Sequence, residues 1–202
     1  MKTLLCDLVT DIRMLFRVPV SAFFTVIFPS LMLIIMMTSY GNPDIGSGIR
    51  LSDKYILIAS GMGLAPLTLI TFPSWICSSV ESSYLLRLKY LHVSLARVAT
   101  SNALAHMVVA LCGTAVTLAG VLFYDMRIPS LPALIAYLLQ LVVVTASLML
   151  FGAALAFIVR QTAVAIAVGL VLMFVVYMLC GVFGDYSAMP AGLQAAGNLV
   201  PL

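Results

Sequence analysis

The feature that most constrains the fold of this chain is a series of five long apolar runs. A bilayer core about 30 Å thick takes about 20 helical residues to cross, and each run is that long. The runs cover about residues 18–40, 55–80, 98–124, 131–159 and 162–183. Because 63% of the residues are hydrophobic and only 8% are charged, we predict an all-α, polytopic helical membrane protein with five transmembrane helices in a single domain, 1–202.

The segment before the first run, residues 1–17, predicts an amphipathic helix rather than a signal peptide. Charged residues interrupt it, and no small-residue cleavage site follows an apolar core. At helical spacing the apolar side chains gather on one arc, which comprises Leu4, Leu5, Leu8, Ile12, Leu15 and Phe16. We expect this helix to lie in the membrane interface, and a helical tail without that role is the alternative.

A proline predicts a kink in the first span, and prolines with the small cluster Ser60-Gly61-Met62-Gly63 predict that the second span is bent and closely packed. Pro29 lies inside the first span, and Pro66 and Pro73 lie inside the second. A substrate path and ordinary helix packing would both use such features. Small residues spaced four apart predict further close helix contacts, at Ala115 and Ala119, Gly152 and Ala156, Ala163 and Ala167, and Ala165 and Gly169.

The basic residues predict the orientation of the chain. With a cytoplasmic N-terminus, that side carries Lys2, Arg13, Arg17, Arg87, Lys89, Arg97 and Arg160, and the other side carries Arg50, Lys54 and Arg127. Seven against three follows the positive-inside rule, so we predict that the N-terminus is cytoplasmic. The net charge of +3 is too small to indicate a nucleic-acid partner.

Three common motifs of nucleotide-binding proteins and zinc enzymes are absent from the sequence. It contains no phosphate-binding G-x-x-x-x-G-K-[ST] loop, no H-E-x-x-H zinc pair and no dinucleotide fingerprint. The cysteines Cys6, Cys77, Cys112 and Cys180 lack close pairing and indicate neither a disulfide nor a metal site. We therefore predict a protein that is not an enzyme and has no catalytic residue, cofactor or metal of its own. An intramembrane protease that pairs Ser47 with His106 is a minor alternative.

Among the polar residues within the predicted spans, the candidates for a functional role are Asn102, His106 and Gln140. A polar group inside a membrane either lines a functional path or bonds a neighbouring helix, and both interpretations stay open here. A proton-coupled carrier would be expected to place an acidic residue deep in a span, whereas the acids of this chain lie at span ends or in loops. An ion-coupled secondary carrier is therefore a weaker alternative.

Three groups of short patterns follow one another along the chain. The first is Arg17-Val18-Pro19, Ala22-Phe23-Phe24 and Phe28-Pro29. The second is Glu81, Leu85-Leu86-Arg87-Leu88 and Val93-Ser94. The third is Gly181-Val182-Phe183, Met189-Pro190-Ala191-Gly192-Leu193-Gln194 and Pro201. In this order they resemble the ABC-2 type exporter permeases, including drug- and antibiotic-resistance exporters, in which an R-x-P, an F-P and an E-R-x-x-G-x-L-[KR]-x-L…P-[LV]-S segment recur.

The chain also departs from the family pattern. Ser82, Ser83 and Tyr84 replace the Arg and Gly after the loop glutamate, and His92 replaces the usual Pro. The resemblance implies that residues 184–202 form an external re-entrant segment. The family has six spans, whereas this sequence stops at Pro201-Leu202, so a truncated sequence and a five-span protein are both possible.

The resemblance implies a mechanical role for the polar loop 81–97. A separate cytosolic ABC ATPase would bind ATP and push on a short helix of the loop, in a complex with a second permease copy in the cytoplasmic membrane of a prokaryote. A helix over 83–95 would present an apolar face for docking, with charges beside it, and the expected coupling residues are Glu81, Tyr84, Arg87, Leu88, Lys89, Leu91 and Leu95. A basic loop that lies on anionic headgroups is the alternative. The implied activity is export of a hydrophobic small molecule, drug or peptide.

Overall fold

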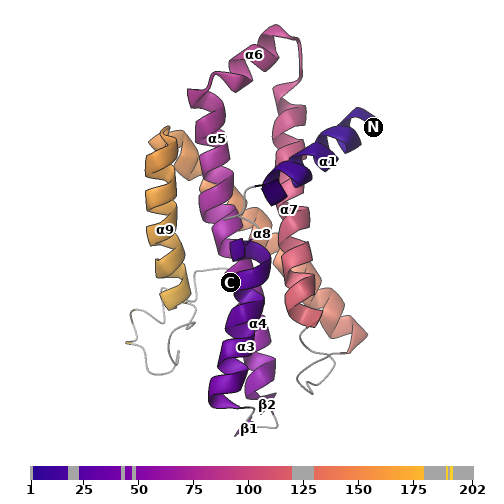
Figure 1. The fold of residues 1–202 in the computed structure, drawn as a ribbon, viewed down its shortest axis with the longest axis vertical. Coiled ribbons are helices and arrows are strands. Elements are labelled where there is room, and N and C mark those ends of the chain that lie inside the picture. Colours follow the sequence, from indigo (N-terminus) through magenta and orange to yellow (C-terminus); the bar gives the residue numbers. More distant parts are fainter. Residues whose placement is uncertain are drawn as a thin grey trace.

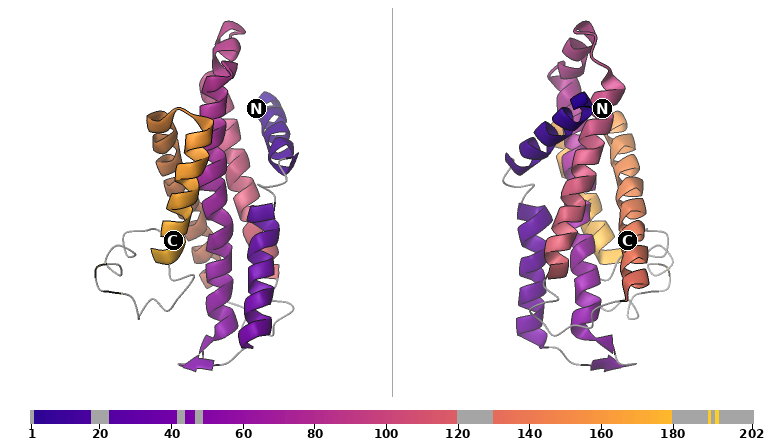
Figure 2. Two further views of the ribbon diagram at one scale, coloured as in Figure 1. Left: turned by 60° about the vertical axis from the view of Figure 1, so that its left-hand side comes forward. Right: turned by 90° about the vertical axis from the view of Figure 1, so that its right-hand side faces the viewer.

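The computed structural model describes residues 2–17, 23–41, 44–46, 49–119, 130–179, 190 and 192. The long helices run roughly along one axis, and α1 (Lys2–Arg17) lies obliquely across one side of this bundle (Figure 1). The short helix α6 (Tyr84–Tyr90) forms one end, and the paired strands β1 (Asp44–Gly46) and β2 (Ile49–Arg50) form the other (Figure 2). The remaining elements are η1 (Phe23–Ile27), α3 (Phe28–Tyr40), α4 (Leu51–Pro66), η2 (Leu67–Thr71), α5 (Phe72–Glu81), α7 (Leu95–Ala119), α8 (Leu131–Val159) and α9 (Thr162–Leu179), where η denotes a π-helical turn.

Among the described residues, four helices are long and apolar enough to cross a membrane. They are Leu51–Glu81, Leu95–Ala119, Leu131–Val159 and Thr162–Leu179, and a shorter apolar helix spans Phe23–Ser39. The predicted all-α polytopic membrane fold is thus confirmed. The fourth span has the predicted bounds, whereas residues 18–22, 120–124 and 180–183 lie outside the described part of the chain. The expected re-entrant segment 184–202 lies almost wholly outside it too.

The helix Leu51–Glu81, which comprises α4, η2 and α5, is the centre of the bundle. Leu64, Ala65 and Leu67 are fully buried in it, and α7, α8 and α9 pack around it. Hydroxyl groups add two polar links. Tyr177 of α9 donates to the carbonyl of Met62 at 2.6 Å, and the hydroxyls of Ser60 and Tyr137 bond α4 to α8. The second predicted span therefore positions all the others.

The predicted bends at Pro29 and Pro73 each coincide with a π-helical turn. Pro29 and Pro73 have no N–H to donate to the carbonyls of Thr25 and Leu69 four residues earlier, and η1 and η2 contain those two carbonyls. The altered turns push carbonyl groups against glycines of neighbouring helices. A methyl group added at Gly113 would lie 2.5 Å from the Thr25 oxygen, and one added at Gly169 would lie within 3.0 Å of the Leu69 oxygen.

The predicted small-residue pairs divide into two classes. Gly152 and Ala156 of α8, and Ala165 and Gly169 of α9, are buried, and the two glycines meet η2. The pairs Ala115 and Ala119, and Ala163 and Ala167, are exposed, so that half of the prediction is wrong. Spacing by four places two residues on one helix face, but it does not say which face meets a neighbour.

Candidate functional site

The hairpin that contains α6 is held by two tight turns. Two residues, Ser82 and Ser83, connect α5 to α6, and Ser83 adopts a left-handed conformation with φ 55°. After α6, His92 does the same with φ 56°, and α7 begins at Leu95. Residues other than glycine rarely adopt positive φ values, so these two turns are specific structural features of the loop. The hairpin thereby carries α6 beyond the ends of α5 and α7 (Figure 1).

The predicted helix over 83–95 is therefore wrong in extent. The observed helix, α6, ends at Tyr90, because the chain turns at Leu91 and His92. Tyr84 and Leu88 still share a face and line a cavity beneath α6, but Leu91 and Leu95 do not continue that face. The apolar side chains most exposed around α6 are Leu86, Tyr90 and Leu91, at 57%, 77% and 71%.

The charged members of the predicted loop site have different surroundings. Arg87 and Lys89 are exposed in the last turn of α6. Glu81, in contrast, bonds within the chain: its Oε1 accepts the backbone N–H of Thr162 at 3.0 Å, and its Oε2 accepts the Thr162 hydroxyl. A carboxylate at the first residue of α9 matches the partial positive charge of a helix N-terminus. Glu81 therefore links the ends of the second and fifth predicted spans.

Two polar contacts fasten α1 to α7. Arg97 Nε lies 2.9 Å from Asp7 Oδ2, and the Ser101 hydroxyl donates to Asp11 Oδ2 at 2.7 Å. Both partners are spaced four apart on their own helix, so the two contacts form one ladder. Part of the predicted apolar arc packs beside it, with Leu8, Ile12 and Leu15 against the core, whereas Leu5 and Phe16 remain exposed.

A cavity of about 470 Å³ lies between α1, α5, α6 and α7. Residues from all four helices and from the turns beside α6 line it: Asp7, Thr10, Asp11, Met14, Trp75, Ser78, Ser79, Ser82, Tyr84, Leu88, Val93, Arg97 and Val98. Sequence reasoning missed Asp7, Asp11, Trp75 and Thr162 as site residues. The matching i, i+4 spacing of Asp7 with Asp11 and of Arg97 with Ser101 is the signal that would have pointed to the helix contact.

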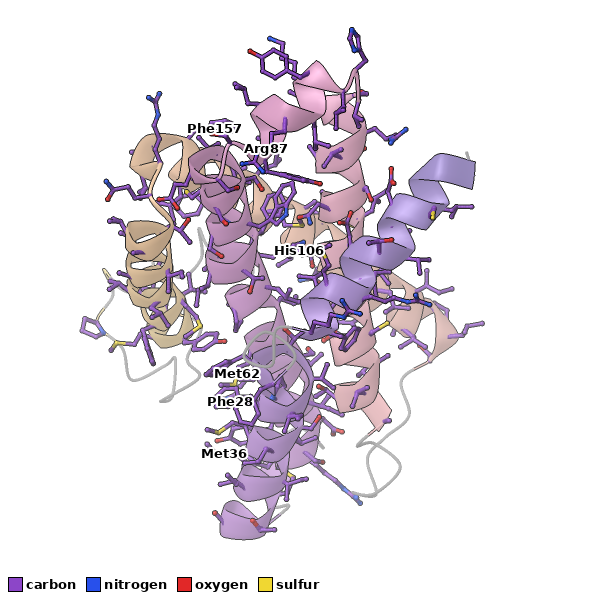
Figure 3. All side chains as sticks on the ribbon, turned by 45° about the horizontal axis from the view of Figure 1, so that its top comes forward. Phe28, Met36, Met62, Arg87, His106 and Phe157 are labelled. Atoms are coloured by element: carbon purple, nitrogen blue, oxygen red, sulfur yellow. The ribbon has the colours of Figure 1, made fainter. Side chains whose placement is uncertain are left out.

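The predicted intramembrane polar residues are separated by the fold. Asn102 and His106 are buried on one face of α7, where His106 Nδ1 donates to the Asn102 carbonyl at 2.9 Å and the ring packs edge-on against Phe72. Figure 3 shows His106 inside the bundle. Gln140 instead lies on the exposed side of α8. Ser47, the partner of His106 in the protease alternative, lies outside the described residues.

The described residues offer no site for a metal ion, since no three of their His, Cys, Asp or Glu side chains come together in a way that would hold one. At the α6 end, the described residues form a projecting helix, a carboxylate that links two helices, and a cavity lined by polar and apolar side chains. Such a site can transmit motion and bind a ligand.

Comparison with known proteins identifies the family of the chain. No curated protein and no solved structure matches the chain. A family model described as ABC-2 type transporter matches residues 8–202, which is nearly the whole sequence. Members of that family are the membrane permeases of ABC transporters and are transport components rather than catalysts. The chain therefore belongs to the ABC-2 type transporter family as a multi-pass membrane permease.

Proposed function

We propose that this chain is the permease subunit of an ABC exporter in the cytoplasmic membrane of a prokaryote, with its N-terminus in the cytoplasm. A separate ABC ATPase subunit binds and hydrolyses ATP and docks on α6. The complex contains two copies of the permease. The substrate is a hydrophobic small molecule, drug or peptide. The family match supports the transport role, and the form of α6 supports the position of the ATPase.

The observation that carries this proposal is the exposure of apolar side chains on a helix outside the bundle. None of the residues of α6 is buried. More than half of the surface is nevertheless exposed on Leu86, Tyr90 and Leu91. They lie beside the basic residues Arg87 and Lys89, which by the positive-inside rule belong on the cytoplasmic side of the membrane. Apolar anchors ringed by charges are typical of a surface that a protein partner covers.

The connections of α6 explain how a push on it reaches the membrane spans. Only two residues separate α6 from α5, so the two helices move together. The end of α5 is bonded to the start of α9 through Glu81 and Thr162. Farther along the same helix, η2 interrupts the regular hydrogen bonding between α4 and α5. Closure of the ATPase would tilt α5 and α9 relative to α4 about that turn.

Docking is tested by purification of the tagged chain together with the ATPase subunit from the native host. The double variant Leu86→Asp with Leu91→Asp places two charges on the exposed apolar surface of the α6 hairpin. We expect the variant to insert normally but to lose the ATPase from the purified complex and to lose ATP-dependent transport. The matched control is Leu86→Met with Leu91→Met, which keeps the volume and apolar character and should retain both.

Two results would contradict the proposal. One is full ATP-driven transport by the Asp double variant at normal expression. The other is a wild-type chain that comes down without any ATPase and transports with an ion gradient alone, which would favour a secondary carrier.

A further inference from the structure

We propose that the cavity between α1, α5, α6 and α7 binds an amphipathic organic cation. The inference rests on the proposed function in one respect only, because it names the class of substrate that the permease takes up. Binding itself needs no ATPase. The volume of about 470 Å³ lies within the range of about 300–1,000 Å³ that is usual for small-molecule sites.

The charged groups of the cavity leave one negative charge uncompensated. Arg97 is the only basic residue among the described residues that line the cavity, and its Nε is 2.9 Å from Asp7, so these two charges neutralise each other. Asp11 accepts a hydrogen bond from the neutral hydroxyl of Ser101 and forms no ion pair within the described part of the chain. The carboxylate of Asp11 is therefore available to a cationic group.

Two of the hydroxyl groups that line the cavity favour the same sign of ligand. Thr10 Oγ1 donates to the Cys6 carbonyl at 2.9 Å, and Ser82 Oγ donates to the Ser78 carbonyl at 2.7 Å. Since each of these protons is already used within its own helix, Thr10 and Ser82 offer a ligand only their oxygen lone pairs. Lone pairs accept from an ammonium or guanidinium group, and they repel an anion.

The remaining lining suits the apolar part of such a ligand. Trp75 stacks on Phe72 with ring centroids 6.4 Å apart, which holds the indole in place as one wall. Met14, Leu88 and Val98 supply further apolar surface. An indole is the side chain that attracts organic cations best through its ring face, so it would contribute to both the charge preference and the apolar contact. A small inorganic cation would leave this surface unused.

The chain offers a direct readout of binding, because Trp75 is the only tryptophan in the sequence. The full-length chain in a non-ionic detergent is titrated with tetraphenylphosphonium, and its tryptophan fluorescence is followed. Tetraphenylborate, which has the same shape and the opposite charge, is the matched ligand control. We expect saturable quenching by the cation and none by the anion at equal concentration.

Variants of Asp11 test the assigned anchor. Asp11→Asn should weaken binding roughly tenfold or more, because a charge-assisted contact is lost. Asp11→Glu should restore it, which separates the role of the charge from an effect on folding. Asp53→Asn, a carboxylate removed at the opposite end of the bundle, should bind as the wild type does.

Three outcomes would overturn the inference: equal quenching by both ions, quenching that never saturates, or unchanged affinity in Asp11→Asn. Because the titration contains no ATPase, each outcome would leave docking at α6 untouched. Conversely, loss of docking in the α6 variants would not alter the fluorescence titration.

Discussion

The carboxylate of Glu81 and the first residue of α9, Thr162, are joined by two hydrogen bonds across 81 positions of sequence. One comes from the backbone N–H and one from the hydroxyl, so the carboxylate binds the helix start in a fixed orientation. The short turn at Arg160 and Gln161, with Arg160 at φ 57°, presents this helix start to α5. The consequence is a rigid connection between two spans at the end where α6 projects.

We expect Glu81→Gln and Thr162→Ala each to lower ATP-driven transport several-fold, since either change removes part of the same connection. The double variant should be no worse than the more severe single variant, because groups that act through one link are not additive. The measurement is transport into inverted vesicles at matched expression. Thr162→Ser keeps the hydroxyl and serves as the control. Additive losses in the double variant would mean that the two residues act separately.

The membrane-spanning helices follow closely from the sequence. Apolar runs of bilayer length predict α8 residue for residue, and the prolines predict where the first two spans deviate from regular helix. The docking of Thr25 against Gly113 was not predictable. Periodicity describes one helix at a time, and it does not identify which glycine on another helix meets an altered turn.

For the candidate site, the sequence predicted the helix in the polar loop but not its extent or its contacts. The polar loop does carry a helix, yet the left-handed turn at His92 ends it before Leu95. Asp7 and Asp11 belong to the polar arc of α1 and would be expected to face solvent. Their partners Arg97 and Ser101 lie 90 residues away, and tertiary packing alone brings them together.

Gly169→Ala should destabilise the fold by about 1–3 kcal/mol, the usual cost of overpacking. The added methyl would approach the Leu69 carbonyl within 3.0 Å, and backbone cannot give way as a flexible side chain does. Thermal unfolding in detergent measures the loss. Ala167→Leu adds a larger group on the exposed side of the same helix and should leave the unfolding temperature nearly unchanged. An equal loss in both variants would contradict close packing of α9 against η2.

Ser60 and Tyr137 should respond unequally to removal of their hydroxyls. Ser60 also donates to the Leu57 carbonyl at 2.7 Å, so Tyr137→Phe leaves no group unsatisfied and should cost about 0.5–1 kcal/mol. Ser60→Ala deprives the partly buried phenol of the one partner that it has among the described residues and should cost about 1–3 kcal/mol. The free energies of unfolding in denaturant would show the order. A larger loss for Tyr137→Phe would contradict it.

The orientation of the chain can be tested through the reactivity of Cys6, which is exposed on α1. In a variant with Cys112→Ala and Cys180→Ala, only Cys6 and the buried Cys77 remain. If the N-terminus is cytoplasmic, a membrane-impermeant maleimide should label Cys6 in inverted vesicles but not in intact cells. Ser130→Cys, placed with Cys6→Ala at the start of α8, should show the reverse, because α8 begins at the end of the bundle away from α6. Labelling of Cys6 in intact cells would put α6 outside the cell, where no ATPase subunit could reach it.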